Sequence, residues 1–189
     1  MAHRAAGASD ELDEVTLRRA QRGDADACRA LVERYQRPVF ALLSRLLGGG
    51  RRAAVEDLAQ ETFLQVFRGL AGFTPLGPAR LSTWILTIAS RRAIDELRRP
   101  ERSVALVTEP IAAERADGDA VRREVAAAIE RALAALAPEY RAAFLLREYH
   151  GLDYADIARA LAIDVGTVKS RLSRARAALR EALAEVRDA

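Results

Sequence analysis

The residues best suited to chemistry lie near the C-terminal end of the chain, in a segment rich in cations and hydroxyl groups. Five basic residues and no acidic residue occur between Val165 and Arg180. Guanidinium and ammonium groups bind phosphates and guanine edges, and short hydroxyl side chains donate hydrogen bonds to either. This composition indicates a surface that contacts nucleic acid.

The rest of the chain offers little to catalysis. It has a single cysteine, Cys28, and two histidines, His3 and His150, so a zinc ion would lack soft ligands. There is no glycine-rich phosphate loop, and neither histidine stands beside a candidate nucleophile. The sequence therefore predicts no enzyme, no metal site and no cofactor.

A helical wheel divides the basic segment into two faces. Apolar residues form one stripe on this wheel, at Val168, Leu172, Leu179, Leu183 and Val186. Short or polar side chains form the opposite face, at Thr167, Ser170, Ser173, Arg174 and Ala177. At about 100° per residue the two sets point in opposite directions. We expect the stripe to pack on preceding helices and the polar face, flanked by the remaining cations, to point outward.

A helix-turn-helix is the element that would position this face. A short helical pattern precedes the basic helix, and "AIDV" at 162–165 joins the two. Asp153 can cap the first helix and Asp164 the second, although Ala162 stands where many such turns have glycine. In this motif the second helix enters the major groove, where small side chains allow close approach. The alternative is a solvated basic helix without a nucleic-acid partner.

Helical periodicity continues through most of the chain. It predicts helices from Asp10 to about Gln21, from Asp24 to 47, at 53–70 and at 82–98. Residues 100–118 contain two prolines and a glycine without a sustained period, which is typical of a linker. No stretch alternates with a period of two. The sequence therefore predicts an all-α fold, with small helical domains at 10–99 and 119–186 joined by a linker at 100–118.

Composition sets the broad class of protein. Half of the residues are apolar, which suffices for a core, but no apolar run reaches the roughly 18–20 residues of a membrane span. The N-terminal residues lack the apolar segment of a secretory signal. We expect a cytoplasmic protein without membrane insertion. The net charge is only +3, so binding to nucleic acid must depend on local clusters of cations.

Two blocks of sequence resemble bacterial RNA polymerase sigma factors of the extracytoplasmic-function group. The segments "DLAQETFLQVFRGL" at 57–70 and "STWILTIASRRAIDELRR" at 82–99 are similar to region 2 of these proteins. The segment "LDYADIARALAIDVGTVKSRLSRARAALREAL" is similar to region 4. The resemblance implies a sigma factor that binds core RNA polymerase and directs promoter-specific transcription initiation.

The resemblance also implies roles for residues of region 2. Docking to core polymerase would involve Asp57, Gln60, Glu61 and Phe63. Opening and capture of the −10 element would involve Arg80, Trp84, Arg91, Arg92, Arg98 and Arg99. For Phe63 and Trp84, however, a place in the core is the more typical role of such a side chain on an apolar helix face. Relatives often have asparagine where Arg91 stands, which leaves the base preference at −10 open.

In region 4 the resemblance implies recognition of the −35 element. The matching positions for the major groove are Lys169, Ser170, Ser173 and Arg174, beside Thr167 on the same outward side. Arg171 and Arg176 would contact phosphates. Many relatives are held inactive by a cognate anti-sigma protein, so the implied partners are core polymerase, promoter DNA and an anti-sigma factor.

Two other classes of protein share parts of this pattern. A response-regulator-like transcription factor has the same C-terminal motif and does not associate with core polymerase. It would need a receiver domain with alternating strands, whereas residues 1–100 have a helical period only. A helical adaptor without DNA contact would leave the cations of the last helix unexplained.

Overall fold

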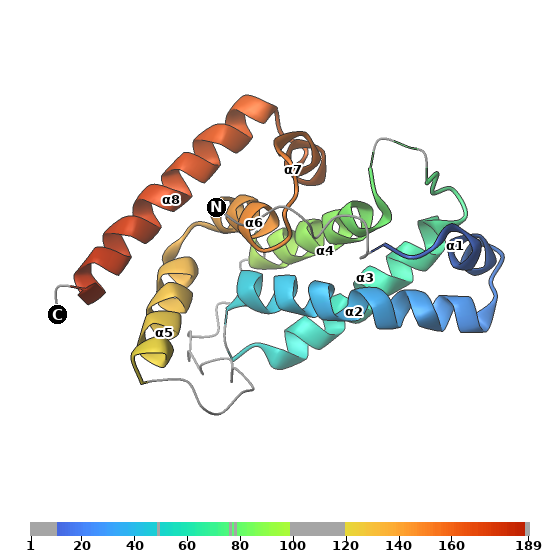
Figure 1. The fold of residues 1–189 in the computed structure, drawn as a ribbon, viewed down its shortest axis with the longest axis horizontal. Coiled ribbons are helices and arrows are strands. Elements are labelled where there is room, and N and C mark those ends of the chain that lie inside the picture. The colour runs from blue at the N-terminus through green and yellow to red at the C-terminus, as the bar shows by residue number, and fades with distance from the viewer. Residues whose placement is uncertain (1–10, 49, 76, 78, 99–119, 188–189) are drawn as a thin grey trace.

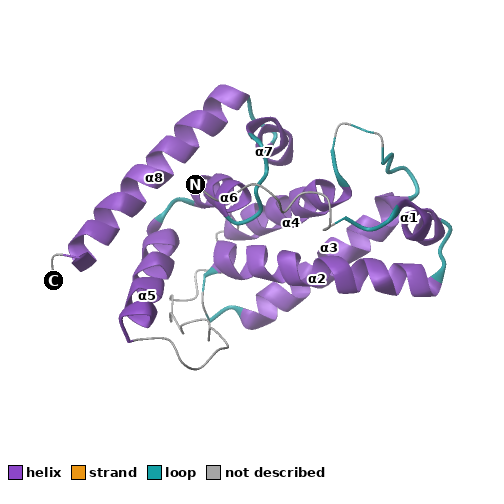
Figure 2. Ribbon diagram, viewed as in Figure 1, coloured by secondary structure: helices purple, strands orange, loops and turns teal. Residues whose placement is uncertain are grey.

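Among the residues that the computed structural model describes, which are 11–48, 50–75, 77, 79–98 and 120–187, eight α-helices and no strands occur (Figure 2). Their bounds are α1 Glu14–Gln21, α2 Ala25–Leu47, α3 Arg52–Leu70, α4 Leu81–Arg98, α5 Ala120–Ala135, α6 Pro138–Glu148, α7 Tyr154–Leu161 and α8 Val165–Arg187. This architecture confirms the all-α prediction. The expected linker at 100–118, with the boundaries at 99 and 119, lies outside the described residues.

Helices α1, α3 and α4 pack around α2, and these four helices form the first group. The apolar residues of α2 recur every three or four positions, so one continuous stripe is buried, including Leu42, Leu43 and Leu46. The helix continues through Pro38. The helix α1 begins later than expected, because Asp13 supplies its cap by accepting a hydrogen bond from the amide of Thr16 at 2.9 Å.

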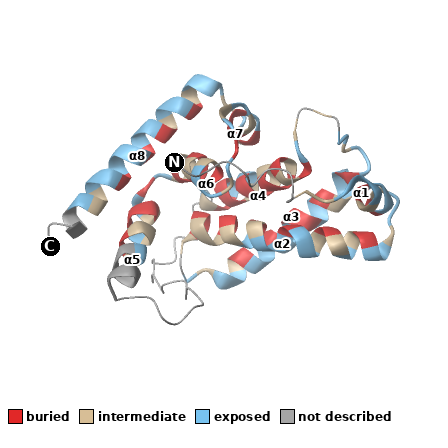
Figure 3. Cartoon of the chain, viewed as in Figure 1, coloured by how far each residue is buried: buried red, intermediate tan, exposed pale blue. Residues whose placement is uncertain are grey.

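In the second group of helices, α8 packs against α5, α6 and α7. Its buried residues are Val168, Leu172, Ala175 and Leu179, which confirms the predicted stripe at Val168, Leu172 and Leu179. Leu183 is half-buried, and the side chain of Val186 lies outside the described part. The rest of the helix is largely exposed along its outer side (Figure 3). The stripe therefore orients the helix, and the cations of α8 face outward as a consequence.

The turn between α7 and α8 comprises residues 162–164 and is held by two local features. Asp164 caps α8, since one carboxylate oxygen accepts from the amide of Thr167 at 2.8 Å and the other from its hydroxyl at 2.6 Å. Ala162 adopts the left-handed conformation, with φ 53° and ψ 49°. Glycine is the usual residue at this position because it has no Cβ to clash.

Replacing Ala162 with glycine should therefore raise the free energy of unfolding by about 0.5–1 kcal/mol. Relief of left-handed strain, about 1–2 kcal/mol, outweighs the added chain entropy of glycine in the unfolded state. Urea denaturation measures the change. The control is Ala155→Gly in α7, an exposed helical position, which should lower stability by about 0.5–1 kcal/mol. Equal destabilisation by both changes would contradict the strain at Ala162.

The two groups of helices pack on each other, chiefly where α4 meets α7 and α2 meets α6 (Figure 1). Arg141 of α6 is 7% exposed, and its guanidinium donates to the carbonyls of Leu46 at 2.7 Å and Leu136 at 2.9 Å. It also donates to the carbonyl of Ala134. These carbonyls lie at the ends of α2 and α5, where no further helical amide is present to bind them. Arg141 thus joins helices from both groups.

A second contact between the two groups lies near His150, which follows α6, and joins α2 to residues of the second group. The neighbour of His150 on α2, Arg45, lies 4.5 Å from the centre of the Tyr149 ring and 3.6 Å from a carboxylate oxygen of Glu130. Burial, and then the positive charge of Arg45, lower the pKa of His150 to about 4. The folded chain therefore holds this imidazole in its neutral form at neutral pH.

We expect stability to fall by about 2 kcal/mol between pH 7 and pH 5 because of His150. In this window the unfolded chain binds a proton with a pKa near 6.5 while the folded chain does not, so acidification favours unfolding. The contribution is fully present above pH 6.5 and is lost as the pH falls toward 4. Denaturation of His150→Gln should lack this decrease. An identical pH profile for parent and variant would contradict the buried neutral state.

Candidate nucleic-acid interface

The outer face of α8 carries the residues that the sequence predicted for −35 recognition. The side chains of Lys169, Ser170, Ser173, Arg174 and Arg176 are exposed, and those of Thr167 and Arg171 are half-buried. The hydroxyl of Ser170 donates to the carbonyl of Thr167 at 2.9 Å, so its oxygen stays close to the helix. The first turns of α8 therefore present short side chains that stay close to the helix backbone, with cations beside them. A helix face of this shape can enter a DNA major groove.

Two of these cations already have partners on α6. Arg174 donates to the hydroxyl of Tyr140 at 2.9 Å, and its guanidinium lies 5.9 Å from the centre of that ring. Arg176 donates to Glu148 at 2.6 Å, and this hydrogen bond raises the pKa of Arg176 above its ordinary value. All four of these side chains are at least partly exposed, so phosphates or base edges could replace the partners at low energetic cost.

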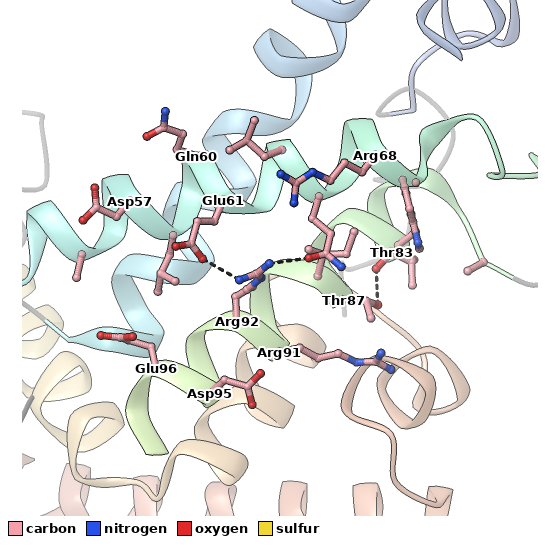
Figure 4. A pocket seen from close by; sticks show the side chains of 18 of the residues that line it. Asp57, Gln60, Glu61, Arg68, Thr83, Thr87, Arg91, Arg92, Asp95 and Glu96 are labelled. Carbon is pink, nitrogen blue, oxygen red and sulfur yellow. Dashed lines mark hydrogen bonds and ion pairs between the residues drawn. The ribbon is translucent and has the colours of Figure 1, made fainter. Parts of the chain in front are cut away.

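A groove of about 1300 Å³ runs between α3 and α4 (Figure 4). Its lining combines an aromatic ring, apolar side chains and charges of both signs. The basic members are Arg68, Arg91, Arg92 and Arg159, and the acidic members are Asp57, Glu61, Asp95 and Glu96. Arg159 belongs to α7, so the second group of helices forms part of the wall.

Trp84 lies in this groove, half-buried against α3 and the loop that follows it. Its ring centre is 5.2 Å from that of Phe73, with 32° between the planes. A Cβ on Gly69 would lie 3.0 Å from the indole, so glycine permits this close packing. Gln21 supports the loop by donating to the carbonyls of Leu70 at 3.0 Å and Phe73 at 2.7 Å. Trp84 is thus partly in the core while one side lines the groove.

The arginines predicted for −10 recognition lie in different places. Arg92 points across the groove and donates to Glu61 at 2.8 Å and Gln65 at 2.7 Å (Figure 4). Arg91 points toward α7, and Arg80 is exposed in the loop before α4, outside the groove lining. Arg99 lies outside the described residues. The groove therefore brings together Trp84, Arg91 and Arg92 and excludes Arg80.

Arg98, the last residue of α4, binds across the interface between the two groups of helices. Its guanidinium donates to Glu139 of α6 at 2.9 Å. Burial of Glu139 opposes its ionisation, but the hydrogen bond from Arg98 and the charge of Arg171 outweigh that effect and lower the pKa of the carboxyl. This carboxylate thus lies beside cations from both groups of helices, Arg98 of α4 and Arg171 of α8.

The exposed face of α3 differs from the sequence prediction at one position. Asp57, Gln60 and Glu61 are exposed, as expected for a docking surface, whereas Phe63 is 8% exposed and packs in the core. The neighbouring Leu64 is 49% exposed and lies one turn beyond Gln60 on the same face. Sequence reasoning missed Leu64, although its spacing of three and four residues from Glu61 and Gln60 would have indicated it.

Neither a metal site nor a membrane span emerges from the part of the chain that the structure describes. No group of three His, Cys, Asp or Glu side chains is placed there to hold a metal ion. None of the described helices combines the length and apolar character required to cross a membrane.

Comparisons with known proteins agree with this geometry. The family model for Sigma-70 region 2 matches residues 31–103, and that for Sigma-70, region 4 matches residues 126–179. The RNA polymerase sigma-H factor of Pseudomonas aeruginosa is 34% identical over 93% of this chain and 95% of its own length. The ECF RNA polymerase sigma-E factor of Escherichia coli K12 is 34% identical over 88% of this chain and 92% of its own.

Solved structures support the fold. CnrH in complex with the cytosolic domain of CnrY has a TM-score of 0.65 and 24% identity, over 92% of this chain and 97% of that chain. RpoE in complex with the anti-sigma factor NepR from Bartonella quintana has a TM-score of 0.66 and 23% identity, and the match covers 82% of this chain and 95% of that chain. The family models cover both groups of helices, and the curated relatives cover nearly the whole length. The chain therefore belongs to the extracytoplasmic-function group of sigma-70 family RNA polymerase sigma factors.

Proposed function

We propose that this sigma factor assigns its tasks to three separate surfaces. As a sigma factor it binds core RNA polymerase and promoter DNA and directs transcription initiation without catalysing a reaction. The outer face of α8 would bind the −35 element, the groove between α3 and α4 would bind the −10 strand, and the exposed face of α3 would bind core polymerase. This activity takes place where the polymerase is, so we assign the protein to the cytoplasm.

The exposed basic face of α8 is the observation that carries the proposal. Asp164 holds the start of the helix, and the buried stripe from Val168 to Leu179 fixes its rotation. Near the N-terminus the exposed side chains are short, so the helix backbone can approach the base edges closely. Arg174 and Lys169 would bind guanine edges, and Arg171 and Arg176 would bind phosphates.

The groove between α3 and α4 suits a single strand whose bases have left the duplex. Capture of unpaired bases needs an aromatic surface for stacking and cations for the backbone. Trp84 supplies the ring, and Arg92 on α4 and Arg68 on α3 supply charge from the two helices that line the groove. Arg92 would have to exchange Glu61 for a phosphate, so binding there should weaken steeply with salt.

An anti-sigma factor is the regulatory partner that we propose. The two similar structures are complexes, one with the cytosolic domain of CnrY and one with the anti-sigma factor NepR. In this chain, Ile129, Phe144 and Leu179 line a second hollow of about 710 Å³ whose rim includes Lys169 and Arg176. An apolar helix with acidic flanks would fit such a site by shape and charge.

The −10 assignment can be tested with a fluorescent single strand carrying the non-template −10 sequence of a promoter that the holoenzyme transcribes. Arg92→Ala should weaken its binding to the holoenzyme about three- to tenfold, because a phosphate contact is lost. The change should shrink as salt is raised. Arg37→Ala, an exposed position on α2 outside the three surfaces, serves as the control. Equal binding by the parent and Arg92→Ala would remove this groove wall from the −10 site.

A further inference from the structure

Arg91 links the −10 groove to the helix-turn-helix through two hydrogen bonds. Its side chain lines the groove, and its guanidinium reaches the end of α7. There Nε donates to the carbonyl of Ala160 at 2.8 Å and Nη2 to the carbonyl of Arg159 at 2.7 Å. These carbonyls belong to the last turn of α7, where a helix has acceptors without intrahelical partners and a partial negative charge.

The geometry of this contact requires arginine. A guanidinium presents parallel N–H donors in a rigid plane, so it can bind two consecutive carbonyls at once. A lysine ammonium at the same place keeps the charge but cannot reproduce the fork. The residue can therefore be changed so that the contact with α7 weakens while a cation remains in the groove.

The contact lies within a larger interface that holds the two groups of helices together. On one side Arg98 of α4 binds Glu139 of α6 at 2.9 Å, and on the other Arg141 of α6 binds the carbonyl of Leu46 at 2.7 Å. Arg91 differs from both because its position also borders the proposed path of the DNA strand. Its two engaged N–H groups cannot bind α7 and a strand phosphate at the same time.

We infer that Arg91 is a latch that couples capture of the −10 strand to release of the helix-turn-helix. In the closed chain it holds the end of α7 against α4. When a strand enters the groove, its phosphate takes over the same donors, α7 is freed, and the α7–α8 unit can move toward the −35 element. The inference rests on the proposed function of the groove, and coupling of this kind is reciprocal, so freeing α7 also favours strand binding.

The test uses the full-length chain labelled with two dyes. Cysteines replace Glu33 of α2 and Glu181 of α8, both exposed, in a Cys28→Ser background, and single-molecule energy transfer measures the fractions of closed and open molecules. We expect Arg91→Lys to raise the ratio of open to closed molecules about tenfold, since a charge-assisted hydrogen bond is lost. Arg92→Lys is the matched control and should leave the ratio unchanged. Within the described residues, Arg92 donates to Glu61 and Gln65 of α3, which belong to its own group of helices.

The second measurement adds the fluorescent −10 single strand to the free chain. The strand should open the parent and should bind Arg91→Lys several times more tightly than the parent. Either of two results would contradict the inference. One is that Arg91→Lys has the same energy transfer as the parent, and the other is that the strand binds the parent without changing the energy transfer. If neither the parent nor Arg91→Lys binds the strand, even with core polymerase present, the assignment of the groove to the −10 strand fails. The energy transfer of Arg91→Lys without strand still decides whether Arg91 holds the two groups of helices together.

Discussion

Replacing Arg174 with alanine should reduce transcription from a cognate promoter about ten- to a hundredfold and relax the preference for one base of the −35 element. A bidentate contact to guanine contributes about 1–3 kcal/mol of discrimination. The side chain points away from the buried stripe of α8 and donates to the hydroxyl of the half-buried Tyr140 at 2.9 Å. Its loss should therefore leave the fold intact. Transcription from promoters with every single −35 substitution measures the effect.

Arg176→Ala is the informative comparison for this prediction. Arg176 flanks the proposed reading face and binds Glu148, so its role would be to hold a phosphate. Its loss should weaken all promoters alike and lower the salt dependence of binding by about one counterion. If both variants keep the parental base profile, Arg174 does not contact a base, and the roles along α8 would have to be reassigned.

Replacing Leu64 with arginine should weaken binding to core polymerase at least thirtyfold. Leu64 is 49% exposed and lies among Asp57, Gln60 and Glu61, so it would be the apolar centre of a polar docking face. Central apolar residues of this kind commonly contribute 2 kcal/mol or more to an interface. Affinity for labelled core enzyme measures the loss, and far-UV circular dichroism checks that the helices remain.

The matched control for Leu64 is Val15→Arg on α1. Val15 is 70% exposed, so it undergoes the same change of chemistry at a site outside the proposed docking face. We expect its affinity for core polymerase to equal that of the parent. Equal losses for both variants would indicate a general effect of added charge, and no loss at Leu64 would place the docking surface elsewhere.

In this chain, whose net charge is only +3, some arginines on the proposed DNA surfaces are already paired with carboxylates. Glu61 and Glu148 each accept a hydrogen bond from an arginine on a proposed DNA surface, Arg92 in the groove and Arg176 on α8. In the unbound chain these carboxylates neutralise cations that promoter phosphates would otherwise attract. Under the proposed assignment, binding would exchange internal ion pairs for phosphate contacts, and we expect this exchange to lower the affinity of the free chain for arbitrary DNA.

Much of the local structure could be predicted because it depends on neighbours in sequence. The helix expected at 53–70 is Arg52–Leu70, and that at 82–98 is Leu81–Arg98. The stripe on α8 and the cap at Asp164 follow from spacing and side-chain chemistry alone. The error at the start of α1 has the same origin, since two aspartates, Asp10 and Asp13, precede that helix and spacing cannot determine which one turns toward the free amides.

The arrangement of the two groups of helices could not be predicted from these patterns. It depends on contacts such as Arg91 with Ala160 and Arg141 with Leu46, which join residues far apart in sequence. In the sequence, an arginine that binds the end of a distant helix has the same spacing as an arginine exposed to solvent, so hydrophobic periodicity cannot distinguish the two. By contrast, the exposure of Leu64 follows from its spacing from Gln60 and Glu61, and the burial of Phe63 is the core alternative that the sequence offered.

The central claim is that the outer face of α8 and the groove beside α4 recognise two separate promoter elements. Its most direct test is transcription by core polymerase and this chain from a pool of templates randomised upstream of the start site, followed by sequencing of the transcribed templates. We expect two enriched blocks, near −35 and −10, and we expect Arg174→Ala to lose one base preference in the upstream block only. Enrichment of a single block, or an upstream block unaffected by Arg174→Ala, would contradict it.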